Sequence, residues 1–402
     1  MSYAGMAGMA GMAGMAGMAG MAGMAGMAGM AGMAGYSGSA GSPLLLDALT
    51  KSREMLAGRV QNEKGPAQWS PLPEWLTRRE LPPGEEPASL QRLDPNIRGY
   101  LAEQELLSHL HFTPPAGRRP ATLRWIAGHR FGSNGAVRAT ATEIVTMTRP
   151  KLSVFEAQLK VVESWAERRE DRASEILVQV LPQISFWSSV VNLHPNRTPK
   201  TLEFIDVALQ FAMLMVMRFK HALGCPRPIE YSPNIQPVLL TPGYATLPSG
   251  HATEAYMFAR VMRRLMGQAD DSETARQLDH LAARIAENRV VAGLHFPADS
   301  TAGRLLGDTL AGLLVSWCTG NHRWQARAFK GERMTDKDRE FQRDESLDPG
   351  AGFPAYFGSR THPSLVPQNR SVLRWMWQQA QEEWTQAGFQ TGHGAPAVAR
   401  NA

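Results

Sequence analysis

The sequence predicts an all-α fold, in the form of a helical bundle. From Lys151 to about residue 320, apolar residues recur at steps of three and four, which places them on one face of a helix. No segment shows the clear alternation of apolar and polar residues that marks a half-buried strand. With 402 residues, 43% of them hydrophobic and 20% charged, the chain can bury a large core.

Two regions precede the predicted bundle. Residues 1–42 contain ten consecutive Ala-Gly-Met triplets. A period of three fits neither a helix nor a strand, and glycine at every third position opposes helix formation, so we expect a disordered tail. Residues 43–150 are interrupted repeatedly by proline and glycine. We therefore expect a region that wraps the core, with short helices at residues 44–57 and 96–110.

Residues 151–320 form the predicted catalytic bundle. Thr198-Pro199 is typical of an N-cap followed by a first-turn proline, and it opens a helix that reaches Lys220. A second helix opens at Ser249 and is expected to stop at Gly267, because glycine is common just after a helix end.

Two further helices complete the bundle. One is expected to start near Ser272 and to end at about Arg289. The last is expected to begin with Asp299 as its N-cap, since a short acidic side chain there accepts from free N–H groups. Gly303 and Gly307 lie four residues apart in this helix, which predicts a face of small residues and close helix packing.

Three short blocks in this region carry the chemistry. They are Lys220-(six residues)-Arg227-Pro228, Pro248-Ser249-Gly250-His251, and Arg289-(five residues)-His295-(three residues)-Asp299. Lysine and arginine bind phosphate-like groups through charge-assisted hydrogen bonds. A helix that starts at the Ser-Gly turn aims backbone N–H groups at the same anion. The blocks therefore predict a site that surrounds a tetrahedral oxyanion with cations, two histidines and one carboxylate.

The order and spacing of these blocks resemble the signature of the superfamily that joins type 2 phosphatidic acid phosphatases, bacterial class A acid phosphatases and vanadium haloperoxidases. The resemblance covers about residues 200–316. It implies a helical bundle of the acid phosphatase and vanadium haloperoxidase type. One position departs from the pattern, because Asn288 stands where the family usually has serine. Asparagine can still donate a hydrogen bond, so we expect a shift in the groups behind the site and no loss of it.

The resemblance also implies a role for each residue of the blocks. Lys220, Arg227, Arg289, Ser249 and the Gly250 N–H would hold the oxygens of the anion. His295 would attack as the nucleophile, with Asp299 fixing its tautomer, and His251 would protonate the leaving group and then activate water. The implied activity is that of a metal-independent phosphatase that hydrolyses phosphate monoesters through a phosphohistidine intermediate and needs no cofactor.

The alternative is a vanadium-dependent haloperoxidase, which oxidises halide with hydrogen peroxide. It is implied as well because the same set of anion-binding residues would bind vanadate. There His295 would ligate vanadium and vanadate would be the cofactor. The segment 293–304 looks more similar to class A acid phosphatases. The long helical region ahead of the first block and the aromatic residue Tyr244 favour the haloperoxidase. The phosphatase is the first choice, and both activities stay open.

Composition limits the partners. The net charge is only +5, and without a long basic run or a nucleic-acid-binding signature we expect a small anionic substrate and no nucleic acid.

The apolar runs 211–217 and 305–318 are too short to span a bilayer. Without a recognisable signal peptide or transmembrane helix we expect a soluble protein. Its location, for which the cytoplasm is one option, its natural substrate and its homo-oligomeric state stay open. Two cysteines cannot form a disulfide framework.

Residues 321–402 are expected to form an extension that packs on the bundle and ends in disorder from Gly388. Its amphipathic segment, 372–384, carries Trp375, Trp377 and Trp384. Such a segment either covers the core or faces a partner, and the sequence leaves both readings open.

Overall fold

The computed structural model describes residues 87–131, 137–180, 183–350, 352–366 and 370–389, together with Asp47 and Lys51. The predicted tail, 1–42, and the chain from residue 390 onward lie outside these residues. The helix predicted at 44–57 also lies outside them, apart from Asp47 and Lys51.

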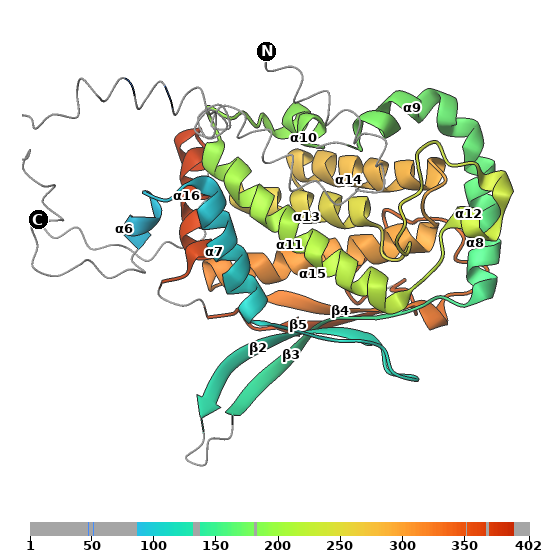
Figure 1. Ribbon diagram of the computed structural model, residues 1–402, viewed down its shortest axis with the longest axis horizontal. Helices are drawn as coiled ribbons and strands as arrows, with labels where there is room; N and C mark the ends of the chain where they lie inside the picture. Colours follow the sequence, from blue (N-terminus) through green and yellow to red (C-terminus); the bar gives the residue numbers. More distant parts are fainter. Residues whose placement is uncertain are drawn as a thin grey trace, which may run out of the picture.

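The described residues form helices and strands in one continuous order, labelled as in Figure 1. They are α6 (Pro87–Leu90), α7 (Pro95–Ser108), β1 (Leu110–Thr113), β2 (Ala121–Phe131), β3 (Val137–Thr148), α8 (Leu152–Ser164), η2 (Trp165–Arg168), α9 (Arg169–Val178), α10 (Ile184–Val191), α11 (Pro199–Leu223), α12 (Pro228–Tyr231), η3 (Pro233–Ile235), α13 (Gly250–Leu265), α14 (Glu273–Val291), α15 (Pro297–Thr319), β4 (Trp324–Lys330), η4 (Gly331–Arg333), β5 (Phe357–His362) and α16 (Val372–Gln386).

The prediction of an all-α fold is wrong, because a five-stranded mixed sheet lies beside the helices. Its order is β1-β2-β3-β4-β5, with β3 and β4 parallel and the other neighbours antiparallel. Figure 1 shows this sheet along the lower side of the bundle, with the β2–β3 hairpin extending away from it. The strands occupy parts of the chain where proline and glycine had suggested a helical wrapping region and a polar extension.

Local irregularity explains why the strands were missed. In the pairing of β2 with β3, Leu123 lies opposite Val145 but Arg124 lies opposite Glu143, so Ile144 is an extra residue in β3. Ile144 and Val145 are consequently both buried, and the apolar alternation breaks at that point. The parallel pairing of β3 with β4 joins segments that are distant in the sequence, which no local pattern reveals.

The helix starts follow the expected signals, with one exception. Helix α11 starts after Thr198, and the Ser249 and Ser272 hydroxyl oxygens accept N-cap hydrogen bonds at the starts of α13 and α14. Asp299, however, is not the N-cap of α15. Phe296 holds that position, and the Asp299 carboxylate reaches back to accept from the Phe296 N–H at 2.8 Å. The acidic residue therefore stabilises the helix start from inside its first turn.

Helix α15 is the centre of the fold, buried along most of its length between the sheet and α13. A Cβ atom on Gly303 would lie 2.6 Å from the Ser249 carbonyl oxygen. One on Gly307 would collide with the Thr253 backbone and lie 3.0 Å from the Met257 nitrogen. The two glycines thus let the backbones of α13 and α15 touch, as their spacing predicted.

The C-terminal part of the chain contributes to the core in two ways. Strands β4 and β5 complete the sheet, while α16 packs against α11, α15 and α7. Trp375, Trp377 and Trp384 are all buried, so this helix covers the core. Among the described helices, none combines the length and the apolar character needed to cross a bilayer.

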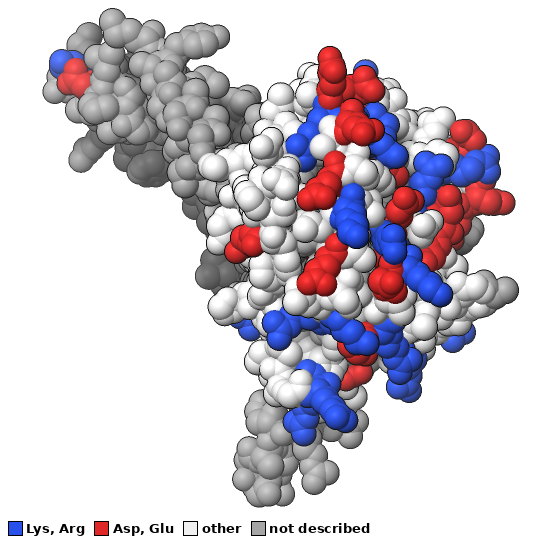
Figure 2. Space-filling view, turned by 90° about the vertical axis from the view of Figure 1, so that its right-hand side faces the viewer, with Lys and Arg blue, Asp and Glu red and all other residues white. Residues whose placement is uncertain are grey.

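The charges on the surface are mixed over much of the visible area. Figure 2 shows the face that carries α8, α9 and α12, where acidic and basic side chains alternate over the upper part and basic side chains gather in a band lower down. The cations of the three sequence blocks are instead inside the molecule, since Lys220, Arg227 and Arg289 are each at most 2% exposed.

The substitution Gly307→Ala should destabilise the protein by about 1–3 kcal/mol, because the added methyl group overpacks the contact between α13 and α15. Gly312→Ala is the matched control in the same helix: its Cβ would lie no closer than 3.9 Å to any neighbour, so it should be neutral or stabilise by up to about 1 kcal/mol. Urea unfolding of both variants measures the difference. Equal stability of the two variants would contradict this account of the helix contact.

Candidate active site

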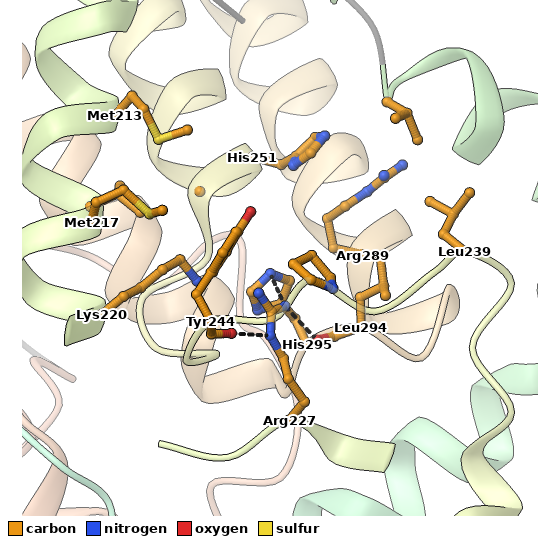
Figure 3. Close-up of a pocket in the computed structure, with 14 residues that line it drawn as sticks. Met213, Met217, Lys220, Arg227, Leu239, Tyr244, His251, Arg289, Leu294 and His295 are labelled. Atoms are coloured by element: carbon orange, nitrogen blue, oxygen red, sulfur yellow. Dashed lines mark hydrogen bonds between the residues drawn. The ribbon is translucent and has the colours of Figure 1, made fainter. Parts of the chain in front are cut away.

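The three sequence blocks meet at one pocket (Figure 3). The residues that line it are Val180, Met213, Val216, Met217, Lys220, Arg227, Leu239, Pro242, Tyr244, Gly250, His251, Arg289, Leu294 and His295. Lys220 comes from the last turn of α11, His251 from the first turn of α13 and Arg289 from the last turn of α14. Arg227 and His295 lie in the connections that lead into α12 and α15. Helix ends therefore deliver most of the polar groups.

Carbonyl oxygens hold the ammonium group of Lys220. Its Nζ donates to the carbonyl oxygens of Ala245 at 2.9 Å and Thr246 at 2.7 Å. An ammonium group has three donors, so one remains for a ligand. The ring of Tyr244 lies 5.3 Å from Lys220 Nζ and 5.2 Å from the guanidinium carbon of Arg227, within the range of cation–π attraction.

The guanidinium groups of Arg227 and Arg289 are only partly satisfied. Arg227 donates to the carbonyl oxygens of Tyr244 and Leu294, each at 3.0 Å, and its Nη1 lies 3.1 Å from Nε2 of His295. Arg227 Nη2 and both Nε and Nη1 of Arg289 are buried and have no hydrogen-bond partner among the described residues. Buried donors without partners are rare in folded proteins, and donors of this kind suit an oxyanion.

The imidazole of His295 is held in one tautomer. Its Nδ1 lies 3.0 Å from Asp299 Oδ2 and donates to that carboxylate, which leaves the lone pair on Nε2. The Thr246 hydroxyl and the Phe296 N–H donate to the same carboxylate oxygen. Asp299 does not line the pocket itself and is fully buried behind His295. Nε2 of His295 therefore carries no proton, and its lone pair is available on the pocket side of the ring.

The imidazole of His251 is held in the opposite tautomer. Its Nε2 lies 3.0 Å from the carbonyl oxygen of Gln179. A carbonyl can only accept, so Nε2 carries the hydrogen and Nδ1 carries the lone pair in the neutral ring. Burial, followed by the charge of Arg289, lowers the pKa of His251 to about 3. The ring is therefore neutral near pH 7 while the pocket holds no anion.

The other charged groups respond to the same burial. Burial, followed by the charges of Arg227 and Lys220, holds the pKa of His295 well below its usual value. Burial also lowers the pKa of Lys220 and brings that of Arg289 to about 10. Burial raises the pKa of the Asp299 carboxyl to about 6, and the hydrogen bonds from Thr246 and Phe296 oppose that shift. A bound anion would offset the repulsion among the cations.

Of the other residues predicted for the site, one lines the pocket and one caps the helix beside it. Gly250 lines the pocket at the start of α13, where first-turn N–H groups have no acceptor within the helix. Ser249 is fully buried but does not line the pocket, and its hydroxyl oxygen accepts from the Ala252 N–H as the N-cap. Among the described residues, no group of histidine, cysteine and carboxylate side chains could hold a metal ion.

Sequence reasoning missed two residues that contact the site from behind. Thr246 is fully buried and links Lys220 to Asp299 through its carbonyl and hydroxyl groups. Gln179 contacts both Arg289 and His251. Thr246 lies two residues before the second block, and this proximity in the sequence could have identified it as a candidate. Gln179 ends a helix far from all three blocks, and nothing in its local pattern marks it.

Asn288, where the family usually has serine, lies directly behind the pocket. Its Nδ2 donates to Glu175 Oε1 at 2.8 Å and to Gln179 Oε1 at 3.0 Å, while its Oδ1 accepts from Arg172 at 3.2 Å. The longer side chain thus reaches groups on α9 and ties that helix to the last turn of α14.

Glu254 allows a test of the electrostatics that is independent of turnover. It lies one turn beyond His251 and is 3% exposed, and burial raises the pKa of its carboxyl to about 8. Between pH 4.5 and about 8 the unfolded chain loses this proton while the folded chain keeps it, so rising pH lowers the stability of the wild type. The free energy of unfolding of Glu254→Gln, relative to the wild type, should therefore rise across this window and level off above it.

Denaturant titrations at several pH values measure this difference. Glu382→Gln, at an exposed glutamate, is the control for removing one negative charge. A difference for Glu254→Gln that stays constant from pH 4.5 to 8 would contradict the raised pKa.

Comparison with known proteins agrees with the site. No curated protein matches the chain. Residues 205–326, which contain all three blocks, match the family model of the PAP2 superfamily, a group that includes phosphatases and haloperoxidases. Over this segment, the chain is similar to the PAP2 superfamily.

Proposed function

We propose that the protein hydrolyses phosphate monoesters through a phosphohistidine intermediate, without a metal ion. One observation carries the proposal: Arg227 and Arg289, which have buried N–H donors with no partner among the described residues, line the same pocket as His295, whose Nε2 is unprotonated. A phosphoryl group fits this combination, since its oxygens accept from guanidinium groups while its phosphorus accepts a nucleophile.

The first step is attack of His295 Nε2 on phosphorus. The N–H donors of Lys220, Arg227 and Arg289 neutralise the charge on the non-bridging oxygens. Nη1 of Arg227 lies 3.1 Å from Nε2 of His295 before a substrate binds. It then donates to the phosphoryl group instead, which frees the Nε2 lone pair for the new N–P bond. Asp299 accepts from Nδ1 throughout and stabilises the positive charge that develops on the ring.

His251 serves both proton transfers. A bound phosphate ester adds negative charge beside Arg289, which opposes the lowering of the His251 pKa and favours the imidazolium. The imidazolium gives its proton to the leaving alkoxide as the P–O bond breaks. The neutral ring then takes a proton from water, whose oxygen attacks phosphorus, breaks the N–P bond and releases phosphate.

The apolar part of the lining supports an organic leaving group. Figure 3 shows Met213 and Met217 from α11 on one side of the pocket and Leu239 on the opposite side. Such side chains provide contacts for alkyl or aryl atoms and no hydrogen-bonding groups for sugar hydroxyls.

The haloperoxidase alternative uses the same residues. Lys220, Arg227 and Arg289 would hold the oxygens of vanadate, and His295 Nε2 would ligate vanadium. The guanidinium donors that have no partner among the described residues fit vanadate as well as phosphate. Bound vanadate would supply peroxide activation for halide oxidation. Hydrolysis remains the proposal, and a direct test separates the two activities.

The two histidines should differ in their dependence on the leaving group. His295→Ala should abolish hydrolysis of every ester, because the intermediate cannot form. His251→Ala should lower the rate by about 10²–10⁴-fold for an alkyl phosphate and by much less for nitrophenyl phosphate, whose leaving group needs little protonation. Measuring kcat on both esters tests this. Equal losses on both esters in His251→Ala would remove His251 from the role of general acid.

Vanadate should act in opposite directions in the two enzyme classes. As a mimic of the trigonal-bipyramidal transition state, it should inhibit ester hydrolysis by this protein, with little bromide oxidation when hydrogen peroxide is added. Hydrolysis of nitrophenyl phosphate and bromination of a dye are measured with and without vanadate. Vanadate-dependent bromination, combined with no hydrolysis by the vanadate-free protein, would replace the phosphatase proposal with the haloperoxidase.

A further inference from the structure

The end of helix α9 contacts the site from outside the segment that matches the PAP2 family model. This helix ends at Val178, and its C-cap residue, Gln179, is fully buried. Both the side chain and the backbone of Gln179 bond to residues that line the pocket. The proposed chemistry assigns no role to it.

The side chain of Gln179 fixes Arg289. Its Oε1 accepts from Arg289 Nη2 at 3.1 Å and from Asn288 Nδ2 at 3.0 Å. Its Nε2 donates to Glu175 Oε1 at 3.0 Å, which orients the amide with its oxygen toward the guanidinium group. Because the carbonyl oxygen of Ile176 also accepts from Nη2, that nitrogen is fully used. Nε and Nη1 of Arg289, which have no partner in the part of the chain that the structure describes, are then left for an anion.

The backbone of Gln179 fixes His251. Its carbonyl oxygen accepts from Nε2 of His251 and thereby sets both the ring rotation and the tautomer. One residue therefore positions a cation that would bind the phosphoryl group and the histidine that would transfer protons. These two roles can be separated experimentally, because a substitution changes the side chain and retains the carbonyl group.

The chemical type of the side chain matters as well. A neutral amide holds Arg289 without cancelling its charge, whereas a carboxylate at this position would pair with the guanidinium group. The carboxylate of Glu175 is itself engaged by Arg284, at 2.9 Å, and by Asn288. The positive charge of Arg289 is therefore preserved for a ligand.

We propose that Gln179 is a positioning residue of this site, whose amide orients Arg289 for anion binding while its carbonyl group orients His251. The inference rests on the proposed function, in that it concerns the same pocket, but it can be measured through binding alone. Calorimetric titration of the full chain with orthophosphate requires no turnover.

Two substitutions test the side chain. Gln179→Met retains the length but removes the amide, so it should weaken orthophosphate binding by about tenfold or more, as expected when a hydrogen bond to a charged group is lost. Gln179→Glu should weaken binding more at neutral pH and recover affinity as the pH falls and the new carboxyl group is protonated. A purely structural role predicts no such recovery.

Gln158→Met is the matched control. Gln158 is a 1% exposed glutamine that bonds the Ala298 N–H and the Asp338 carbonyl oxygen and does not line the pocket. It should lose comparable thermal stability and retain its orthophosphate affinity. In Gln179→Met, the ratio of nitrophenyl to alkyl phosphate rates should also be unchanged, because the carbonyl group that orients His251 is still present.

The outcomes separate this inference from the proposed function. Unchanged orthophosphate affinity in both Gln179 variants would overturn the role of Gln179, and so would a wild type that binds no orthophosphate. A wild type that binds orthophosphate but hydrolyses no ester would instead count against the phosphatase. In that case the Gln179 variants would still decide whether this residue positions Arg289.

Discussion

The burial of three cations around one pocket is the constraint on which the site depends. In the described part of the chain no ion pair joins a carboxylate to Lys220, Arg227 or Arg289, and backbone carbonyl oxygens bond to all three. Carbonyl groups satisfy donors but carry only partial charge, so the pocket stays positive. An anion that enters it gains electrostatic attraction from three buried cations, and its binding stabilises the folded state.

The close contact of α13 with α15 brings the second and third blocks together. Gly303 and Gly307 let the backbones meet, and the Ser249 N–H donates to the Asp299 carbonyl oxygen at 2.9 Å. Gly293 allows another close approach, two residues before His295. Its φ is +76°, and a Cβ there would lie 2.8 Å from Nη2 of Arg169. Backbone contacts, which allow little adjustment, therefore set the distances between the groups of the proposed site.

Hydrogen bonds hold the two histidine rings in opposite tautomers. The Asp299 carboxylate places the hydrogen of His295 on Nδ1, and the Gln179 carbonyl places that of His251 on Nε2. Burial and nearby cations keep the pKa of each ring low. In the proposed mechanism, a bound anion would oppose part of that electrostatic effect, so substrate binding would itself prepare His251 to donate a proton.

The helical half of the fold and the residues of the three blocks could be predicted from the sequence, because helix periodicity, capping residues and block spacing are local properties. The sheet could not: an extra residue in β3 breaks the alternation, and the pairing of β3 with β4 joins distant segments.

The sequence by itself thus determined the cations, the histidines, the carboxylate and the helices that carry or flank them. Only the tertiary structure decided how these groups are supported. Ser249 caps a helix instead of lining the pocket, and Asp299 lies inside its helix and not at the N-cap. Gln179 reaches Arg289 and His251 only because α9 packs against α14. Hydrogen bonds between residues 72 and 110 positions apart depend on packing, and local sequence patterns contain no information about them.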